Sequence, residues 1–290
     1  MAKYVILGHE NPDVDSIVSG YLLEKLMQQK GYDILFIIPD KKIDETSVKI
    51  CQEYGLHVCN YQKNLGDFLD CKFILVDHHK RKDVKNVVAV VDHHPTMEKI
   101  NVPYYQNEKK SSTSCLICQG ENESYFSKTD IKLALLAAFV DTASFHSTKT
   151  CEKDVVWARE MCEKYSLDYE KLYQAGLCLT DVSDLKESCF NGLKKYEIGS
   201  YKIASSYVQV LHFEDLDLKM EKMLDYLREY FVENGLDVYL FLVHDMTIFK
   251  TIVYDLRENE LKIEKYEEYA ARGETILPKI EKECMDGLNS

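Results

Sequence analysis

Two groups of acidic and histidine residues stand where apolar segments of this chain end. The first is the segment 8–16, Gly-His-Glu-Asn-Pro-Asp-Val-Asp-Ser, directly after the apolar run 4–7. The second is a pair of Asp-His-His triplets at 77–79 and 92–94, each at the end of an apolar run. Carboxylate oxygens and imidazole nitrogens together suit Mn²⁺ or another borderline divalent ion. Because a charged cluster at the end of a buried strand is costly unless it is paired or bound to metal, the pattern favours a metal site.

The elements around the first group predict where its side chains lie. The run 4–7 is short and rich in β-branched residues, which indicates a buried strand. Apolar residues recur at helical spacing after Asp15, which indicates a helix. His9, Asp13 and Asp15 therefore belong to the turn between the carboxyl end of a strand and the amino end of a helix. Open α/β sheets bind ligands at such turns, and a helix N-terminus favours phosphate.

Strands and helices alternate up to about residue 180. We expect strands at 33–38, 56–59, 72–77 and 87–92, and helices at 45–54, 112–120, 130–145, 152–165 and 168–178. This alternation predicts an α/β domain with a doubly wound, mainly parallel sheet. The strands 72–77 and 87–92 are joined by only about eight residues, whereas a parallel crossover usually needs a dozen or more. Either one helical turn at 82–86 is enough, or the two strands are not adjacent.

The pattern changes in the last third of the chain. We expect a strand at 202–210, a long amphipathic helix at 215–234, and strands at 237–243 and 248–254 that form a hairpin. A domain boundary is expected near 186–190. The sequence thus predicts a metal-binding catalytic domain at 1–186 and a smaller mixed α/β domain at 190–290.

Composition excludes some classes of function. The formal net charge of −13 over 290 residues argues against a nucleic-acid polymer as partner, since that surface would be basic. No apolar run approaches the roughly 20 residues of a membrane span, and the chain enters a strand at once. We therefore expect no membrane contact, no signal peptide and a cytoplasmic location. The ten cysteines are expected to be reduced, and the Cys115/Cys118 pair to be two core residues of one helix.

Each polar residue has a simpler explanation when it is taken alone. A single Asp at a strand end is usually a turn or helix cap, and a His-His pair is more often structural than a ligand. Asp141, inside the apolar run 133–145, would be an unfavourable lone carboxylate. A His-x3-Asp-x-Asp segment, two strand-end Asp-His-His triplets and this Asp within one predicted domain favour the metal site.

At these residues the sequence resembles the DHH phosphoesterase superfamily, in particular its manganese-dependent family II inorganic pyrophosphatases and related exopolyphosphatases. The resemblance covers nearly the whole chain. It implies two Mn²⁺ ions, with Co²⁺ or Mg²⁺ as alternatives, an active site in the interdomain cleft and hydrolysis of a phosphoanhydride bond. The metal ligands that it implies are His9 and Asp13 for the first ion, Asp15, His93 and Asp141 for the second, and Asp77 for both.

The resemblance also implies roles for neighbouring residues. Asp92 would orient a histidine, and His94 would contact substrate or donate a proton. Lys202 and Arg272, in the C-terminal domain, would bind the substrate's phosphates. The family's Ser-Arg-Lys-Lys-Gln motif is matched here by Ala-Arg-Gly-Glu-Thr at 271–275, so the Arg is kept and both Lys are lost. His79, where those pyrophosphatases have Asn, is an extra side chain of undecided role.

The sequence therefore predicts a divergent manganese-dependent inorganic pyrophosphatase that acts on a small phosphate compound. An exopolyphosphatase, or a nucleotide phosphodiesterase or phosphatase of the same branch, stays open because the basic clamp is depleted. A non-catalytic phosphate or nucleotide sensor is disfavoured by the complete set of implied ligands. Relatives with a glycine-rich nucleotide motif are disfavoured because the chain has no Gly-Gly pair. The resemblance also implies a homodimer formed through the N-terminal domain.

Overall fold

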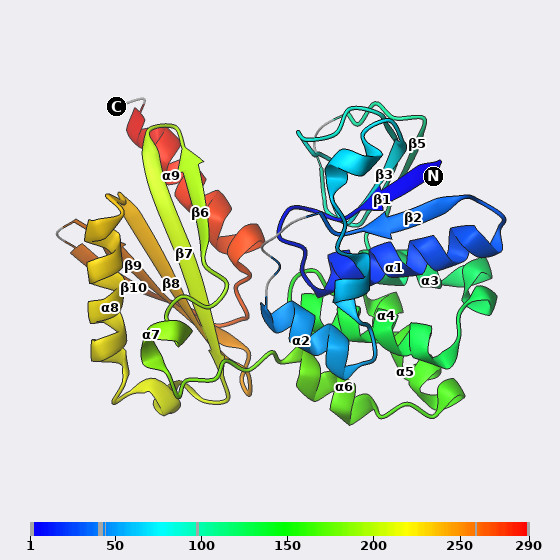
Figure 1. Cartoon of the computed structure of the whole chain (residues 1–290). Coiled ribbons are helices and arrows are strands. Elements are labelled where there is room, and N and C mark those ends of the chain that lie inside the picture. The colour runs from blue at the N-terminus through cyan, green and yellow to red at the C-terminus, as the bar shows by residue number, and fades with distance from the viewer. Residues whose placement is uncertain (1–2, 40–42, 44, 97–98, 259, 289–290) are drawn as a thin grey trace. The chain divides into compact units, whose positions relative to one another are not determined.

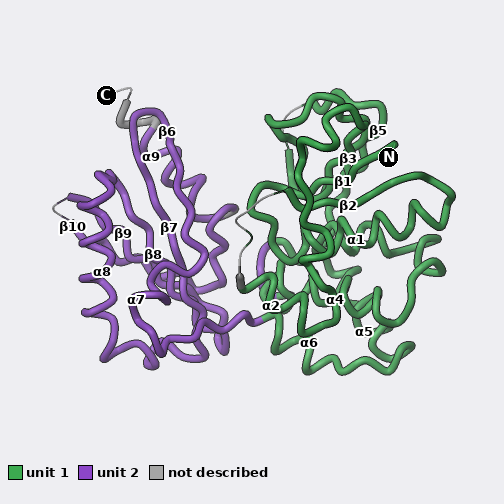
Figure 2. The backbone as a smooth tube through the Cα atoms, in the orientation of Figure 1, with its two compact units in different colours: residues 1–145, 149–176 green, residues 146–148, 177–290 purple. Residues whose placement is uncertain are grey.

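The chain folds into two compact units (Figures 1 and 2). This computed structural model describes residues 3–39, 43, 45–96, 99–258 and 260–288. Unit 1 comprises residues 1–145 and 149–176, and unit 2 comprises residues 146–148 and 177–290. The division at 176/177 precedes the expected boundary at 186–190. The reason is that Val182, Leu185 and Phe190 already pack against the core of unit 2.

Unit 1 is built on a five-stranded parallel sheet. Its strands are β1 (Tyr4–Leu7), β2 (Ile34–Ile37), β3 (Lys72–Val76), β4 (Val87–Asp92) and β5 (Tyr104–Asn107), in the order β2-β1-β3-β4-β5. The predicted parallel α/β sheet is confirmed. The predicted strand at 56–59 is wrong, because Val58–Tyr61 forms a 3-10 helix. Leu56 and Val58 bury their side chains in the core without joining the sheet, so an apolar stretch there did not require a strand.

The connection between β3 and β4 is short and contains no helix. The two strands are nonetheless parallel neighbours, with a register shift between Phe73 and Ile74. Both explanations offered for the short connection are therefore wrong. The crossing segment is anchored at two points instead: Val84 is buried in the core below it, and Arg81 Nη1 donates a 2.9 Å hydrogen bond to the carbonyl of Gly8.

Helices cover one face of this sheet. They are α1 (Val14–Gln29), α2 (Glu45–Glu53), α3 (Thr113–Cys118), α4 (Lys128–Asp141), α5 (Glu152–Tyr165) and α6 (Tyr169–Gly176), close to the predicted ranges (Figure 1). The larger core joins them to Ile6, Val76 and Val91 of the strands. The opposite face, with Leu7 and Leu75, packs under the connecting segments and a 3-10 helix at Leu65–Phe68.

Unit 2 is a mixed sheet with helices on both faces (Figure 1). Its strands are β6 (Lys194–Ile198), β7 (Tyr201–Val210), β8 (Val238–Asp245), β9 (Lys250–Arg257) and β10 (Glu260–Tyr266), in the order β10-β9-β8-β7-β6. The helices are α7 (Leu185–Ser188), α8 (Met220–Glu233) and α9 (Leu277–Leu288), with a 3-10 helix at Phe213–Leu216 and a π-helical turn at Arg272–Ile276. Alternate residues of β8 face opposite cores: Phe241 packs in the cluster with Leu227 of α8, and Leu240 in the cluster with Ile280 of α9.

The smaller mixed α/β domain is thus confirmed in outline. The predicted hairpin is β8–β9, and the predicted helix at 215–234 is interrupted, because a 3-10 helix ends at Leu216 and α8 begins at Met220. All ten cysteines are free thiols, with Cys115 and Cys118 buried on α3 as expected. Among the described residues, no helix combines the length and apolar character needed to cross a membrane.

Candidate metal centre

The strand order of unit 1 brings the conspicuous residues to one edge of its sheet. In the sheet, β2 lies next to β1 on one side and β3 lies next to it on the other. The chain therefore leaves β1 toward one edge of the sheet and leaves β3 toward the opposite edge. Open α/β sheets bind ligands at the point where neighbouring connections diverge in this way. The first histidine-acid segment follows β1, Asp77 follows β3, and β4 ends at Asp92. Because β1, β3 and β4 are parallel neighbours, their carboxyl ends lie side by side.

His9, Asp13 and Asp77 form a first group of ligand atoms. The Nε2 atom of His9 lies 3.4 Å from Oδ2 of Asp13 and 3.7 Å from Oδ2 of Asp77. The other ring nitrogen, Nδ1, donates a 2.8 Å hydrogen bond to the carbonyl of Glu10. With its proton on Nδ1, the His9 ring directs the lone pair of Nε2 at the two carboxylates.

Asp15, His93 and Asp141 form a second group. The Nε2 atom of His93 lies 3.3 Å from Oδ2 of Asp141 and 3.9 Å from Oδ2 of Asp15. Here too Nδ1 donates to a backbone carbonyl, that of Lys110, at 2.9 Å. Both histidines are therefore held in the tautomer that a metal ligand needs.

Asp77 lies between the two groups. Its Oδ2 faces His9, and its Oδ1 lies 3.5 Å from Nε2 of His93. The residue is buried and has φ +63°, a left-handed conformation that is costly for aspartate and that clusters at functional sites. Burial and the nearby charges of Asp15 and Asp13 raise its pKa well above the usual range. Burial likewise raises the pKa of Asp15.

These residues fit a divalent cation. Among the described residues, nothing hydrogen-bonds to Nε2 of His93 or Oδ2 of Asp141, although both atoms are buried. A cation between them would satisfy both atoms and offset the mutual repulsion of the carboxylates. Mixed carboxylate and imidazole donors suit Mn²⁺ better than they suit Ca²⁺, which is typically bound by oxygen atoms alone.

The first turn of α3 holds two of these carboxylates in place. Asp15 accepts hydrogen bonds from the backbone N–H groups of Thr113 (2.7 Å) and Ser114 (3.0 Å), and from the Ser114 hydroxyl (2.6 Å). The Thr113 hydroxyl donates to Asp77 Oδ1 at 3.0 Å. Sequence reasoning missed both residues. The only signal was the polar run 111–114 before an apolar helix.

Asp92 orients two histidines that belong to neither group. Its Oδ1 accepts hydrogen bonds from Nδ1 (2.8 Å) and the backbone N–H (3.1 Å) of His94, and its Oδ2 accepts one from Nδ1 of His79 (3.2 Å). Burial would lower the pKa of His94, but the hydrogen bond to Asp92 raises it above the ordinary value. His94 and His79 are thus fixed by one carboxylate, whereas His93 is fixed by a backbone carbonyl.

Lys149 is a cation inside the centre that sequence reasoning also missed. Its Nζ lies 2.6 Å from Oδ1 of Asp141, and both side chains are largely buried. Burial would lower the pKa of Lys149, but the charges of Asp141, Asp13 and Asp77 raise it. The residue has no motif of its own in the sequence, because the ion pair depends on how the segment after α4 returns to the sheet edge.

The two predicted phosphate-binding residues lie in unit 2. Lys202 is exposed on β7, and its backbone N–H donates to Asp237. Arg272 donates from Nη1 to the carbonyls of Gly192 (2.5 Å) and Ser205 (3.2 Å), and its guanidinium lies 5.5 Å from the centroid of the Tyr207 ring. Arg272 is therefore fixed by its own unit. A role of either residue in substrate binding stays a prediction.

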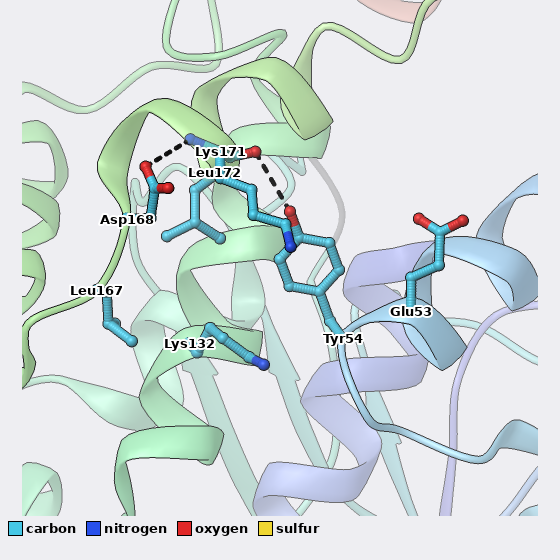
Figure 3. A pocket seen from close by; sticks show the side chains of 7 residues that line it. All are labelled: Glu53, Tyr54, Lys132, Leu167, Asp168, Lys171 and Leu172. Atoms are coloured by element: carbon cyan, nitrogen blue, oxygen red, sulfur yellow. Dashed lines mark hydrogen bonds between the residues drawn. The ribbon is translucent and has the colours of Figure 1, made fainter.

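Two other features do not form part of this centre. A cavity of about 80 Å³ in unit 1 is lined by Tyr54, whose ring lies near the ammonium groups of Lys132 and Lys171 (Figure 3). It contains none of the candidate ligands. In unit 2, His212, Glu214 and Asp245 also approach one another, but Asp245 accepts backbone hydrogen bonds from Phe213, Thr247 and Ile248 and so serves the local turn.

The unit that carries the candidate metal centre is similar to a known protein family. Residues 3–139 match the DHH family, N-terminal domain. Unit 1 therefore contains a DHH domain. The matched range includes every candidate ligand except Asp141, which lies two residues beyond it.

The chain has curated relatives along most of its length. One, from Bacillus licheniformis, is named as a probable manganese-dependent inorganic pyrophosphatase and is 26% identical over 282 residues, covering 91% of this chain and 89% of the relative. Another of that name, from Listeria monocytogenes, is 27% identical over 259 residues, covering 84% and 82%. The domain and these relatives support a metal-dependent phosphohydrolase.

Solved structures share the two-domain fold of the chain. A Methanococcus jannaschii protein assigned to the family II inorganic pyrophosphatases superposes with a TM-score of 0.68 at 20% identity, covering 96% of this chain and 98% of that one. An exopolyphosphatase-related protein from Bacteroides fragilis superposes with a TM-score of 0.52 at 14% identity, covering 99% and 94%. At these identities the likeness concerns the fold.

Proposed function

We propose that this DHH protein is a manganese-dependent inorganic pyrophosphatase that hydrolyses diphosphate to two phosphates. The observation that supports it best is the position of Asp77, whose two oxygens face His9 on one side and His93 on the other. One carboxylate shared between two groups of ligands is the arrangement expected of a site for two adjacent ions. The curated relatives carry the same activity in their names.

In the proposed centre, His9, Asp13 and Asp77 would hold one ion, and Asp15, His93, Asp141 and Asp77 would hold the second. Two bound divalent ions lower the pKa of a bound water and neutralise charge on a phosphoryl group. The chain's own residues set the geometry for this chemistry. Hydrogen bonds from α3 keep Asp15 from rotating, and the backbone carbonyls of Glu10 and Lys110 keep the two histidine rings in position.

His94 is the proposed contact between this centre and the substrate. Its side chain is 38% exposed beside buried Asp77, with Nδ1 3.7 Å from Oδ1 of that residue. The hydrogen bond from Nδ1 to Asp92 favours the protonated ring, which leaves an N–H at Nε2 to donate to a phosphate oxygen. In unit 2, Lys202 and Arg272 are the proposed cations for the far phosphate.

Phosphate release by the purified protein with Mn²⁺ tests the proposal. Diphosphate, tripolyphosphate, long polyphosphate and ADP are compared at equal concentration. We expect diphosphate to be hydrolysed, Asp77→Ala to be inactive, and Asp70→Asn, a change at an exposed aspartate of the same unit, to behave as wild type. Absence of diphosphate hydrolysis with Mn²⁺, Co²⁺ and Mg²⁺ would overturn the proposal. A homodimer formed through unit 1 and a cytoplasmic location stay predictions.

A further inference from the structure

A groove of about 760 Å³ adjoins the metal centre on unit 1. Its lining includes His9, a candidate metal ligand, together with Glu10 and the crossing segment between β3 and β4. The volume lies in the range of about 300–1,000 Å³ that small-molecule sites occupy. We propose that this groove binds the nucleoside part of a nucleotide whose phosphates reach the metal centre, so that nucleoside polyphosphates are also substrates. The inference rests on the proposed phosphoanhydride hydrolysis.

The rim of the groove is basic in an acidic protein. Lys80, Lys82 and Lys99 line it and are exposed, against the single acid Glu10. The chain as a whole has 49 acidic and 36 basic residues, so three lysines around one groove run against its composition. A basic rim beside a phosphate-cleaving centre suits an anion.

Part of the groove's lining is apolar. Val87, Ile100 and Val102 are half-buried there, and they pack against the core that contains Leu75. An inorganic phosphate chain has nothing to gain from these side chains, since it would exchange water for hydrocarbon. A purine or pyrimidine ring would gain from them by burying its own apolar faces.

The segment that carries two lysines of the basic rim is held in place by its own hydrogen bonds. Arg81 donates from Nη1 to the carbonyl of Gly8 at 2.9 Å and is paired with Asp83 through Nε at 2.9 Å. These contacts tie the segment that carries Lys80 and Lys82 to the end of β1, directly before His9. A segment that is already fixed loses little conformational entropy when a ligand binds, which favours affinity.

In the proposed reaction the oxygen of water bonds to the terminal phosphorus, and the bond from that phosphorus to the bridging oxygen breaks. The electron pair of the broken bond stays on the nucleotide, which leaves with one phosphate fewer, and inorganic phosphate is the other product. Water supplies the protons that the products carry or release, and nothing is oxidised or reduced.

Binding of AMP by calorimetry, without metal and without turnover, tests the site. We expect AMP to bind at least about tenfold more tightly than ribose 5-phosphate, which lacks the base that would cover the apolar side chains of the lining. Lys80→Glu/Lys82→Glu should weaken AMP binding about tenfold, the size expected when two exposed charges are reversed. Lys85→Glu is the control, because Lys85 is exposed on the same segment but outside the lining.

Kinetics separate this inference from the proposed function. The double variant should raise KM for ADP about tenfold and leave KM for diphosphate within about twofold. If AMP does not bind, or binds both variants and wild type equally, the groove is not a nucleotide site even where diphosphate is hydrolysed. If AMP binds as expected and no phosphate compound is hydrolysed, the nucleotide site stands and the proposed pyrophosphatase activity fails.

Discussion

Asp77 and Lys149 have opposite effects on the charge of the centre. Asp77 is one of several buried carboxylates that repel one another, which is what raises its pKa. Lys149 offsets part of that repulsion through its ion pair with Asp141. The ammonium pairs with Oδ1 of Asp141, whereas Oδ2 faces His93 and is the oxygen left for a cation. The charge of Lys149 should therefore repel a metal ion bound at this residue.

We expect Lys149→Met to bind Mn²⁺ about tenfold more tightly than wild type, because the repelling charge is gone. The metal-free variant should be less stable by about 1–3 kcal/mol, since Asp141 loses a largely buried partner. Calorimetric titration with Mn²⁺ and urea unfolding in EDTA measure the two effects. Lys153→Met, at an exposed lysine nearby, should change neither. Unchanged or weaker Mn²⁺ binding in Lys149→Met would contradict this repulsion.

Asp92 offers a test of His94. The hydrogen bond to Asp92 raises the pKa of His94, so replacing that carboxylate by an amide should lower it. If protonated His94 donates to substrate, activity falls as pH rises through this pKa. Asp92→Asn should then move the alkaline limb of the kcat/KM profile to lower pH and reduce kcat by roughly 10–100-fold, as loss of an orienting partner does. An unmoved limb would show that His94 is not the group that titrates.

At the scale of elements, the turn at the start of α3 is the support on which Asp15 depends. Ser114 contributes both its backbone N–H and its hydroxyl to one carboxylate oxygen. Ser114→Ala removes the hydroxyl and keeps the backbone contact. We expect Mn²⁺ affinity to fall by roughly 10–100-fold, measured by competition with a fluorescent chelator. Ser124→Ala, at an exposed serine of the same unit, is the control and should bind Mn²⁺ as wild type does.

Some elements were predictable because one signal dominates them. β1, β3 and β4 are apolar, β-branched runs buried in the sheet, and their ends carry the motif residues. β5 was not predicted, because Tyr104–Asn107 has an exposed, half-polar pattern. β10 was missed for a similar reason: it is an edge strand that alternates polar and apolar residues, with little of it buried.

The residues of the candidate site likewise fall into those that were predictable from the sequence and those that were not. The residues within the motifs could be named from the sequence, since their types and spacing are local. Ser114 reaches Asp15 across 99 residues, and Lys149 reaches Asp141 only because the chain turns back after α4. Contacts of this kind are set by tertiary packing, and single serines or lysines in polar segments carry no sign of them.

At the scale of the whole molecule, the raised pKa of Asp77 links folding to pH and metal. At Asp77 the folded protein binds more protons than the unfolded chain between the ordinary aspartate pKa of about 4 and the raised value. The contribution of Asp77 to stability is therefore fully present below about pH 4 and is lost as pH rises through the raised pKa. Each unit of raised pKa corresponds to about 1.4 kcal/mol. Bound metal requires the ionised carboxylate and should reverse the trend.

Urea unfolding at pH 5 and pH 7.5, in EDTA and in Mn²⁺, measures this linkage. In EDTA the wild type should lose more stability between the two pH values than Asp77→Asn does, because the variant has no carboxyl to ionise. In Mn²⁺ the stabilisation of the wild type should be larger at pH 7.5. Equal slopes for wild type and variant in EDTA would contradict the burial of an ionisable Asp77 in the folded protein.

The central claim is that one shared carboxylate holds two ions, and anomalous diffraction at the manganese edge from crystals grown with Mn²⁺ tests it most directly. We predict two anomalous peaks in unit 1, one bound by His9 and Asp13, the other by Asp15, His93 and Asp141, with Asp77 a ligand of both. A single peak that does not touch Asp77, or a peak only at His212, Glu214 and Asp245 of unit 2, would contradict the account.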